Sequence, residues 1–428
     1  MSFDIIVKGG TLPDGKAADI GISGGTITAI APKLTAEART VVDATGNLVS
    51  PPFVDPHFHM DATLSYGLPR INASGTLLEG IALWGELKPL LTYEAVRDRA
   101  LAYCDWAVSM GLLAIRTHVD TCDDRLLAVD ALLDVKKTVA PYIDLQLVAF
   151  PQDGFYRNAA ARENTLRALD KGVDIVGGIP HFERTMADGT RSVTELCEIA
   201  ADRGLMVDMH CDETDDPLSR HIEQLAYETQ RLGLRGRVAG SHLTSMHSMD
   251  NYYVSKLLPL MAEAEVSAIP NPLINIMLQG RHDTYPKRRG LTRVPEMLRY
   301  GIRVGWGQDC VLDPWYSLGT ADMLDVAFMG LHVAQMSSPN DMRTCFDMVT
   351  KTNAEIMGLD HLGLEVGKAA SLVVLDAGNP VEAIRLRAER LCVIARGRVV
   401  AERDRRETKL SIDGRPKTVS RRHEIQRG

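Results

Sequence analysis

The sequence predicts an α/β fold, a (β/α)8 TIM barrel beside a small β-sandwich domain that both termini build together. In the middle of the chain, short apolar runs alternate with long amphipathic segments, which is typical of βα units and a parallel sheet. Near both ends, β-branched runs are broken by turn residues such as Gly-Gly and Asp-Gly. We therefore expect residues 53–360 to form the barrel. Residues 1–52 and 361–428 should form the β-sandwich domain, the latter with a charged tail.

Size and composition narrow the class of protein. The chain has 428 residues, of which 45% are hydrophobic and 24% are charged, as in soluble globular proteins. A net charge of −8 argues against nucleic acid as the main partner. The sequence shows no apolar stretch long enough to cross a membrane and no signal-peptide pattern at its start. Its seven cysteines form no CxxC pair and are typical of reduced thiols, so we expect a cytoplasmic protein.

Eight apolar runs of strand length occupy the central segment. They cover residues 53–59, 112–120, 144–152, 174–182, 206–213, 238–244, 266–272 and 303–309. Amphipathic stretches predict helices at residues 93–110, 126–138, 193–203 and 217–232. In a (β/α)8 barrel the carboxyl ends of all eight strands meet at one mouth, where barrel enzymes hold their sites.

Histidines at the end of the first barrel strand predict a metal site. His57 and His59 are two residues apart, so on a strand their side chains point to the same face. His210 ends the fifth strand and Asp309 ends the eighth, at the same mouth. Imidazole and carboxylate are common ligands of divalent ions, and an ion with an open position acidifies a bound water. We therefore expect one divalent ion held by His57, His59, His210 and Asp309.

Three further polar residues predict chemistry on a ring amide. Glu213 lies three residues past His210 and could move a proton onto a ring nitrogen while water attacks the adjacent carbon. His242 ends the sixth strand and could orient the attacking oxygen. Gln152 offers a donor and an acceptor, which suits the amide edge of a pyrimidine. His118 and His181 also end strands, where packing or supporting roles are the simpler interpretation.

In combination these motifs resemble those of the amidohydrolase superfamily. The motifs are His57-Phe58-His59, His210-Cys211-Asp212-Glu213, Ser241-His242 and Gln308-Asp309. Further motifs are similar to those of bacterial cytosine deaminases within it, namely Phe150-Pro151-Gln152, Pro180-His181-Phe182-Glu183 and Asp313-Pro314-Trp315-Tyr316. The resemblance implies one Fe2+ or Zn2+ ion and catalytic roles for Glu213, His242 and Asp309. It also implies that Gln152 and the backbone near Leu77 bind a pyrimidine, with Trp315 as a pocket wall.

Cys310 departs from the pattern of that family. Such deaminases carry two adjacent aspartates after strand 8, whereas this chain has Gln308-Asp309-Cys310. Cysteine is small and largely apolar, so it would leave space for a methyl group or a halogen on the ring. We therefore expect deamination of 5-methylcytosine to thymine and ammonia, or of cytosine to uracil and ammonia.

Other interpretations of the same residues stay open. A related aminohydrolase could act on isocytosine or an amino-triazine with the same ligands. Cyclic-amide hydrolases such as dihydropyrimidinases use a carboxylated lysine from strand 4, and residues 174–182 contain no lysine. An inactive scaffold would have dropped metal ligands, and the sequence keeps the full set. As partners we expect a pyrimidine base and further copies of the chain in a homo-oligomer, without nucleic acid or membrane.

Overall fold

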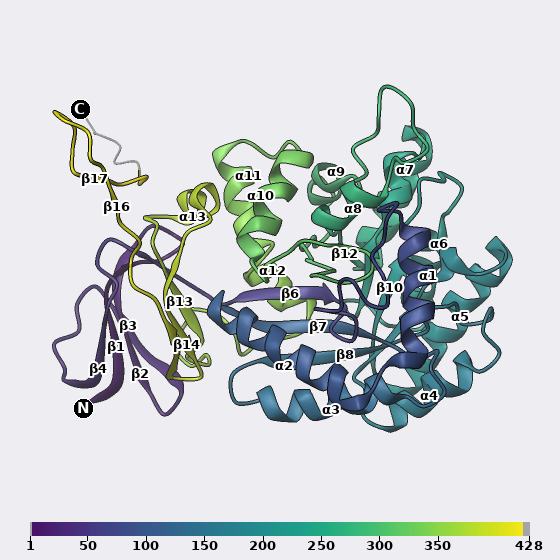
Figure 1. The fold of residues 1–428 in the computed structure, drawn as a ribbon, viewed down its shortest axis with the longest axis horizontal. Helices are drawn as coiled ribbons and strands as arrows, with labels where there is room; N and C mark the ends of the chain where they lie inside the picture. Colours follow the sequence, from purple (N-terminus) through teal and green to yellow (C-terminus); the bar gives the residue numbers. More distant parts are fainter. Residues whose placement is uncertain (1, 423–428) are drawn as a thin grey trace.

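The computed structural model describes residues 2–422 and confirms the predicted fold class. Within these residues a seven-stranded parallel sheet forms a nearly closed barrel, and a separate eight-stranded sheet stands beside it (Figure 1). Strands from both ends of the chain lie together at one side of the barrel. The predicted charged tail continues past Arg422, so its end, including Arg427, falls outside the described residues.

The separate sheet has the strand order β15-β14-β13-β5-β1-β2-β3, and β4 pairs with β1 in parallel. Ile5, Ile20, Val49, Leu372 and Ile394 belong to one buried cluster, so strands from opposite ends of the sequence share a core. The strands are β1 Phe3–Thr11, β2 Ala17–Ser23, β3 Thr26–Ala31, β4 Ala38–Asp43, β5 Leu48–Ser50, β13 Leu372–Leu375, β14 Arg390–Ala395 and β15 Arg398–Glu402, followed by a small hairpin of β16 Thr408–Lys409 and β17 Thr418–Val419.

The barrel sheet has the order β12-β11-β10-β9-β8-β7-β6, with parallel neighbours throughout. Its strands are β6 Phe53–Phe58, β7 Leu112–Asp120, β8 Asp144–Phe150, β9 Ile175–Gly178, β10 Met206–Cys211, β11 Val238–His242 and β12 Ser267–Ile269. Most end earlier than predicted, so His59, Gln152 and Glu213 lie just past the strands and not within them. The predicted end of β9 is instead a short 3-10 helix, η2 Pro180–Phe182, because proline has no N–H for the sheet.

The eighth predicted strand, residues 303–309, is not a regular strand in the structure. Isolated bridges and single hydrogen bonds, such as that from the Gln308 N–H to Asp55 Oδ1, connect it to β12 and β6 in place of a continuous ladder. The side chain of Asn353 explains the interruption, because its Nδ2 donates to the backbone oxygens of Val54 at 2.7 Å and Trp306 at 2.9 Å. This amide replaces hydrogen bonds of a regular ladder and still holds the segment against β6.

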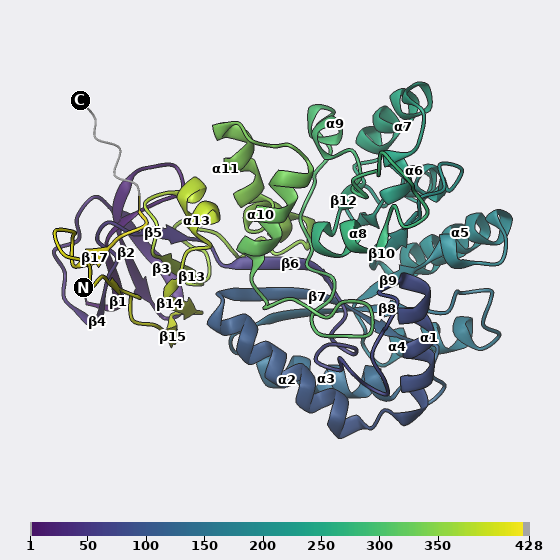
Figure 2. The ribbon, with the colours of Figure 1, turned by 45° about the horizontal axis from the view of Figure 1, so that its top comes forward.

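Helices pack around the outside of the barrel strands (Figure 2). They are α2 Tyr93–Ser109, α3 Leu127–Val139, α4 Ala161–Asp170, α5 Met186–Arg203, α6 His221–Arg231, α7 Asn251–Glu263, α8 Pro272–Leu278, α9 Val294–Arg299, α10 Met323–Val333, α11 Pro339–Asp347 and α12 Lys351–Ile356, with η3 Thr244–His247 after β11 and α13 Pro380–Leu386 beside the second sheet. Helix α1 Leu77–Leu87, continued by η1 Lys88–Leu90, lies beyond the ends toward which β6, β7 and β8 point (Figure 1). None of the helices in residues 2–422 has the length and apolar character that crossing a membrane requires.

Two predicted helices begin elsewhere than expected. Helix α5 starts at Met186, seven residues before the predicted start, because the Thr185 side chain caps it by accepting from the Asp188 N–H. Helix α6 starts at His221, four residues after the predicted start. There the carboxylate of Asp212 accepts from the N–H groups of His221 at 3.1 Å and Ile222 at 2.9 Å. A side chain from the end of β10 therefore sets where α6 begins.

Candidate metal centre

The four predicted ligands come together at the barrel mouth. His57 lies in β6, His59 directly follows it, and His210 lies in β10. The N–H of His59 donates to the Asp309 backbone oxygen at 3.0 Å, and the Asp309 N–H donates to the His57 backbone oxygen at 2.8 Å. These two bonds place the Asp309 side chain beside both histidines. Asp309 adopts a φ of 72°, a conformation that costs energy for aspartate and that concentrates at functional sites.

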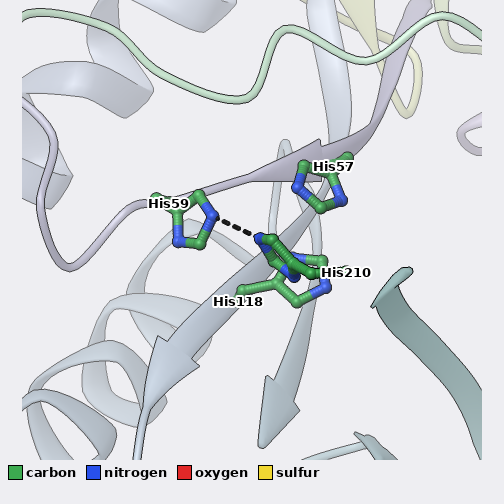
Figure 3. A group of neighbouring side chains, drawn as sticks. All are labelled: His57, His59, His118 and His210. Carbon is green, nitrogen blue, oxygen red and sulfur yellow. Dashed lines mark hydrogen bonds between the residues drawn. The ribbon is translucent and has the colours of Figure 1, made fainter. Parts of the chain in front are cut away.

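The ring nitrogens and the carboxylate converge on a small volume. His59 Nε2 lies 2.9 Å from His210 Nε2, and Asp309 Oδ1 lies 3.5 Å from His59 Nε2 and 3.6 Å from His57 Nε2. Figure 3 shows the rings of His57, His59 and His210 directed toward one another, with His118 beside them. All of these side chains are buried. The arrangement concentrates buried potential metal ligands at the barrel mouth.

The electrostatics of this cluster fit a bound cation. Burial lowers the pKa of His57 and His210 well below the usual value, and it lowers the pKa of His59 to about 3. The rings are therefore neutral, and each keeps one nitrogen lone pair. His57 Nε2 is buried without a hydrogen-bond partner among the described residues. The nitrogen lone pairs face a carboxylate and one another, so the electron-rich atoms repel each other. A divalent ion bound between them would replace this repulsion with attraction.

Glu213 and His242 lie beside the predicted ligands. His242 Nδ1 is 3.6 Å from Glu213 Oε1 and 3.8 Å from Asp309 Oδ2. Burial, and secondarily the charge of Asp309, raises the pKa of Glu213 well above its usual value. The amide Nδ2 of Asn275 lies 2.9 Å from His242 Nδ1 and orients that ring. We did not predict Asn275 from the sequence, although Asn271 and Asn275 are four residues apart at the start of α8 and thus share a face.

A cavity lies at the mouth of the barrel beside these groups. It is lined by His59, Leu77, Leu78, Ile81, Gln152, Ile179, His181, Phe182, His210, Glu213, His242, Ile274, Leu278, Asp309, Cys310 and Trp315. The predicted substrate-binding residues, Gln152, Leu77, Cys310 and Trp315, thus line one space with Glu213 and His242. His57 does not line it and lies deeper in the barrel. One side of the cavity is formed by the first residues of α1.

Comparison with known proteins agrees with this arrangement. Residues 40–401 match the model of the Amidohydrolase family. The chain belongs to the amidohydrolase family. N-isopropylammelide isopropyl amidohydrolase of Pseudomonas sp. (strain ADP) is 30% identical over 408 residues, covering 94% of this chain and 98% of the relative. Membership in this family and the buried histidine–aspartate cluster together imply a divalent metal ion.

Two further proteins of this family are similar over most of the chain. The crystal structure of 5-methylcytosine deaminase from Klebsiella pneumoniae liganded with 5-fluorocytosine superposes with a TM-score of 0.92 at 42% identity, covering 95% of this chain and 99% of that one. Pterin deaminase of Rhizobium rhizogenes (strain K84 / ATCC BAA-868) is 28% identical, covering 90% of this chain and 87% of the relative. The printed activities of these amidohydrolases differ, so their names alone do not assign a substrate to this chain.

In this amidohydrolase His118 and His181 occupy different surroundings. His181 lines the cavity, and burial lowers its pKa to about 4. The ring of His118 lies 4.3 Å from that of His57 and 4.5 Å from that of His210, between centroids. Neither nitrogen of His118 has a hydrogen-bond partner among the described residues. One ligand atom each from His57, His59, His118 and His210 could lie within 4.8 Å of one another, so His118 directly adjoins the metal cluster.

The cavity wall formed by Trp315 rests on α1. The rings of Trp315 and Trp84 lie 5.8 Å apart, and Trp84 Nε1 donates to Asp120 Oδ2 at 2.7 Å. Gly80 faces Trp315 so closely that a Cβ there would lie 2.4 Å from the Trp315 Cδ1 atom. A glycine at this position therefore lets the indole pack against the helix.

Proposed function

We propose that this chain is a metal-dependent hydrolytic deaminase of cytosine-type pyrimidine bases that accepts a substituent at ring carbon 5. Its reactions would be 5-methylcytosine to thymine plus ammonia, and cytosine to uracil plus ammonia. The observation that carries the proposal is one cavity. Glu213 and His242 line it beside the proposed metal ligands, and Gln152 and Cys310 also line it. Similarity to the Klebsiella pneumoniae 5-methylcytosine deaminase supports the same substrate class.

The proposed cofactor is one Fe2+ or Zn2+ ion held by His57, His59, His210 and Asp309. When bound, the ion acidifies a water molecule and so supplies the nucleophile. Three imidazoles and one carboxylate are a donor set that suits these borderline cations. His242 would orient the attacking oxygen, since its ring is fixed by Asn275 and faces Asp309.

Glu213 would serve as both the acid and the base. Burial raises the pKa of its carboxyl, which favours the protonated form, so Glu213 would donate a proton to the ring nitrogen as water attacks the adjacent carbon that bears the amino group. It can then accept a proton from the added hydroxyl group and pass it to the amino group, which leaves as ammonia. Gln152 would bind the amide edge of the ring with one donor and one acceptor and so hold this carbon in place.

The surroundings of Cys310 fit an apolar ring substituent. Cys310, Ile274, Leu278 and Tyr316 form a buried apolar cluster against which Trp315 packs. Burial raises the pKa of the Cys310 thiol well above its usual value, so this side chain is uncharged at neutral pH. A small, uncharged side chain beside an apolar cluster leaves space for a methyl group or a halogen on the ring of the substrate. A hydrated carboxylate at position 310 would not.

A second candidate is deamination of another ring. The Pseudomonas relative acts, by its name, on N-isopropylammelide, and the Rhizobium relative on a pterin. Ammonia release should be measured with cytosine, 5-methylcytosine, 5-fluorocytosine, isocytosine, an amino-triazine and a pterin. We expect the highest kcat/KM with a cytosine. A preference for the triazine or the pterin would overturn the assignment to pyrimidines. We further propose a cytoplasmic location, which fractionation of cells would test.

A further inference from the structure

A buried polar chain runs away from the metal cluster behind His57. The Nδ1 atom of His57 lies 2.8 Å from the hydroxyl oxygen of Ser241, and this hydroxyl donates to Asp208 Oδ1 at 2.7 Å. Ser241 comes from β11 and Asp208 from β10, so the chain links three strands of the barrel. All three side chains are fully buried.

The direction of the hydrogen bonds determines the tautomer of His57. An ionised carboxylate only accepts, so the single hydroxyl hydrogen of Ser241 is donated to Asp208. The Ser241 oxygen can then only accept from His57, which requires a hydrogen on Nδ1. In a neutral imidazole the other nitrogen, Nε2, then carries the lone pair. This is the atom that faces Asp309 at 3.6 Å and has no hydrogen-bond partner in the described part of the chain.

Asp208 is paired with a buried arginine. Arg116 Nη1 lies 3.0 Å from Asp208 Oδ2, and both side chains are fully buried. Arg116 is fixed further by Gln146, whose Oε1 accepts from Nε at 3.1 Å. Its Nη2 also donates to the backbone oxygen of Ile356 at 3.3 Å. A buried carboxylate needs such a partner to remain ionised, and the pair holds the acceptor of the chain in one position.

We propose that Ser241 and Asp208, held by Arg116, are positioning residues that fix His57 in the Nδ1–H tautomer and aim Nε2 at the metal ion. The hydrogen-bonded partner of a metal-bound histidine sets its ring orientation and raises its basicity, and removing such partners costs about 10–100-fold in metal affinity. This inference rests on the metal site of the proposed function but not on the proposed substrate. Sequence reasoning placed Ser241 in a motif without a role and did not single out Asp208 or Arg116.

The test measures metal binding without substrate. Metal-free protein is titrated with Co2+ in competition with a chelator, and its visible absorption spectrum is recorded. We expect Ser241→Ala to bind Co2+ about 10–100-fold more weakly and to change the spectrum. Ser267→Ala is the matched control, since Ser267 is a buried serine at the start of the adjacent strand β12, and it should stay within about twofold of wild type.

A second pair of variants distinguishes the effect of the Ser241 hydroxyl on metal affinity from the effect of altered packing. Ser241→Thr and Ser241→Val add side chains of the same size to this buried position, so they crowd it equally, but threonine alone keeps the hydroxyl. We expect the threonine variant to bind Co2+ at least about tenfold more tightly than the valine variant. In addition, Asp208→Asn should cost less affinity in the Ser241→Ala background than in wild type, because the hydrogen-bonded link from Asp208 to His57 through Ser241 is then absent.

The outcomes distinguish this inference from the proposed function. If wild-type protein binds no metal, both fail. If wild type binds Co2+ and Ser241→Ala binds it with the same affinity and spectrum, the positioning role is wrong while the metal site stands. Equal affinities of the threonine and valine variants would also overturn it, because the hydroxyl would then have no part in binding.

Discussion

The Nε2 atoms of His59 and His210 face each other at a distance of 2.9 Å. Burial keeps both rings neutral, and two N–H groups would collide at this distance, so at least one of the two nitrogens directs a lone pair into the space between them. Asp309 Oδ1 adds negative charge 3.5 Å from His59 Nε2. A cation is the simplest partner for this set, and the first prediction follows from it.

We expect purified protein to hold about one catalytic ion per chain. His57→Ala or Asp309→Ala should lose both the ion and the turnover, because each removes one of four ligands. Elemental analysis of dialysed protein measures the ion. His332→Ala serves as the control, since His332 bonds the backbone of its own helix α10 and should keep both properties. Two tightly held ions, both needed for activity, would contradict this prediction.

Replacement of Glu213 should separate chemistry from metal binding. Glu213→Gln keeps the size of the side chain but cannot transfer a proton, so kcat should fall by at least ~100-fold. Metal content and thermal stability should remain near those of wild type, because Glu213 is not among the proposed ligands. Steady-state ammonia release and elemental analysis give the two readouts. Turnover that persists in a metal-loaded Glu213→Gln protein would move the acid–base role to His242 or His181.

Cys310 should control the choice between cytosine and 5-methylcytosine. Burying one methyl group is worth roughly 1 kcal/mol, or about fivefold in relative kcat/KM. Cys310→Asp should reverse any preference for 5-methylcytosine, since a carboxylate next to Asp309 draws water into the apolar cluster. Cys310→Ala is the control, because it removes the thiol without adding charge and should keep the preference. The hypothesis is wrong if wild type rejects 5-methylcytosine, or if Cys310→Asp leaves the ratio unchanged.

Two glycines in α1 offer a matched pair for testing the cavity wall. A Cβ at Gly80 would lie 2.4 Å from Trp315, whereas a Cβ at Gly85 would meet no atom within 4 Å among the described residues. Both alanine variants gain helix propensity of up to about 1 kcal/mol. Gly80→Ala should displace Trp315 and raise KM severalfold with unchanged metal content. Gly85→Ala should leave KM as it is. Similar KM values for both variants would show that this wall does not shape substrate binding.

Asp313 should make stability depend on pH. Burial raises its pKa to about 7 in the folded chain, while its unfolded value is near 3.8. The folded state thus binds more protons between these values, so stability falls as pH rises from about 4 to about 7. The limit of the effect is about 4 kcal/mol, at ~1.4 kcal/mol per pKa unit.

The variant Asp313→Asn lacks this titration. Its Oδ1 can still accept from the N–H groups of Trp315 and Tyr316, both at 2.9 Å in wild type. The free energy of unfolding of metal-free protein should be measured by chemical denaturation at several pH values. The value for Asp313→Asn minus the value for wild type should increase from pH 5 to pH 8. A difference that stays constant over this range would refute the buried, raised pKa of Asp313.

Much of the site could be predicted because its signals are local. His57 and His59 alternate on one strand, and Glu213 follows His210 by three residues, so short stretches of sequence carry these relationships. The eighth strand could not be predicted correctly. The amide of Asn353 interrupts its ladder with β6, and because Asn353 is distant in sequence, no local pattern predicts that contact.

By itself the sequence determined the barrel with its separate β-domain, and it predicted that the histidines and Asp309 gather at the barrel mouth. Alternation of side chains along a strand and the polarity of strand ends depend on neighbouring residues, so short stretches of sequence carry these signals. Only the tertiary structure decided which groups lie against these side chains and against His242. Ser241 contacts His57, Asp208 contacts Ser241 and Arg116 contacts Asp208, each from another strand, and Asn275 contacts His242 from α8. Such contacts depend on how distant strands are placed around the barrel, and this placement follows from packing of the whole core.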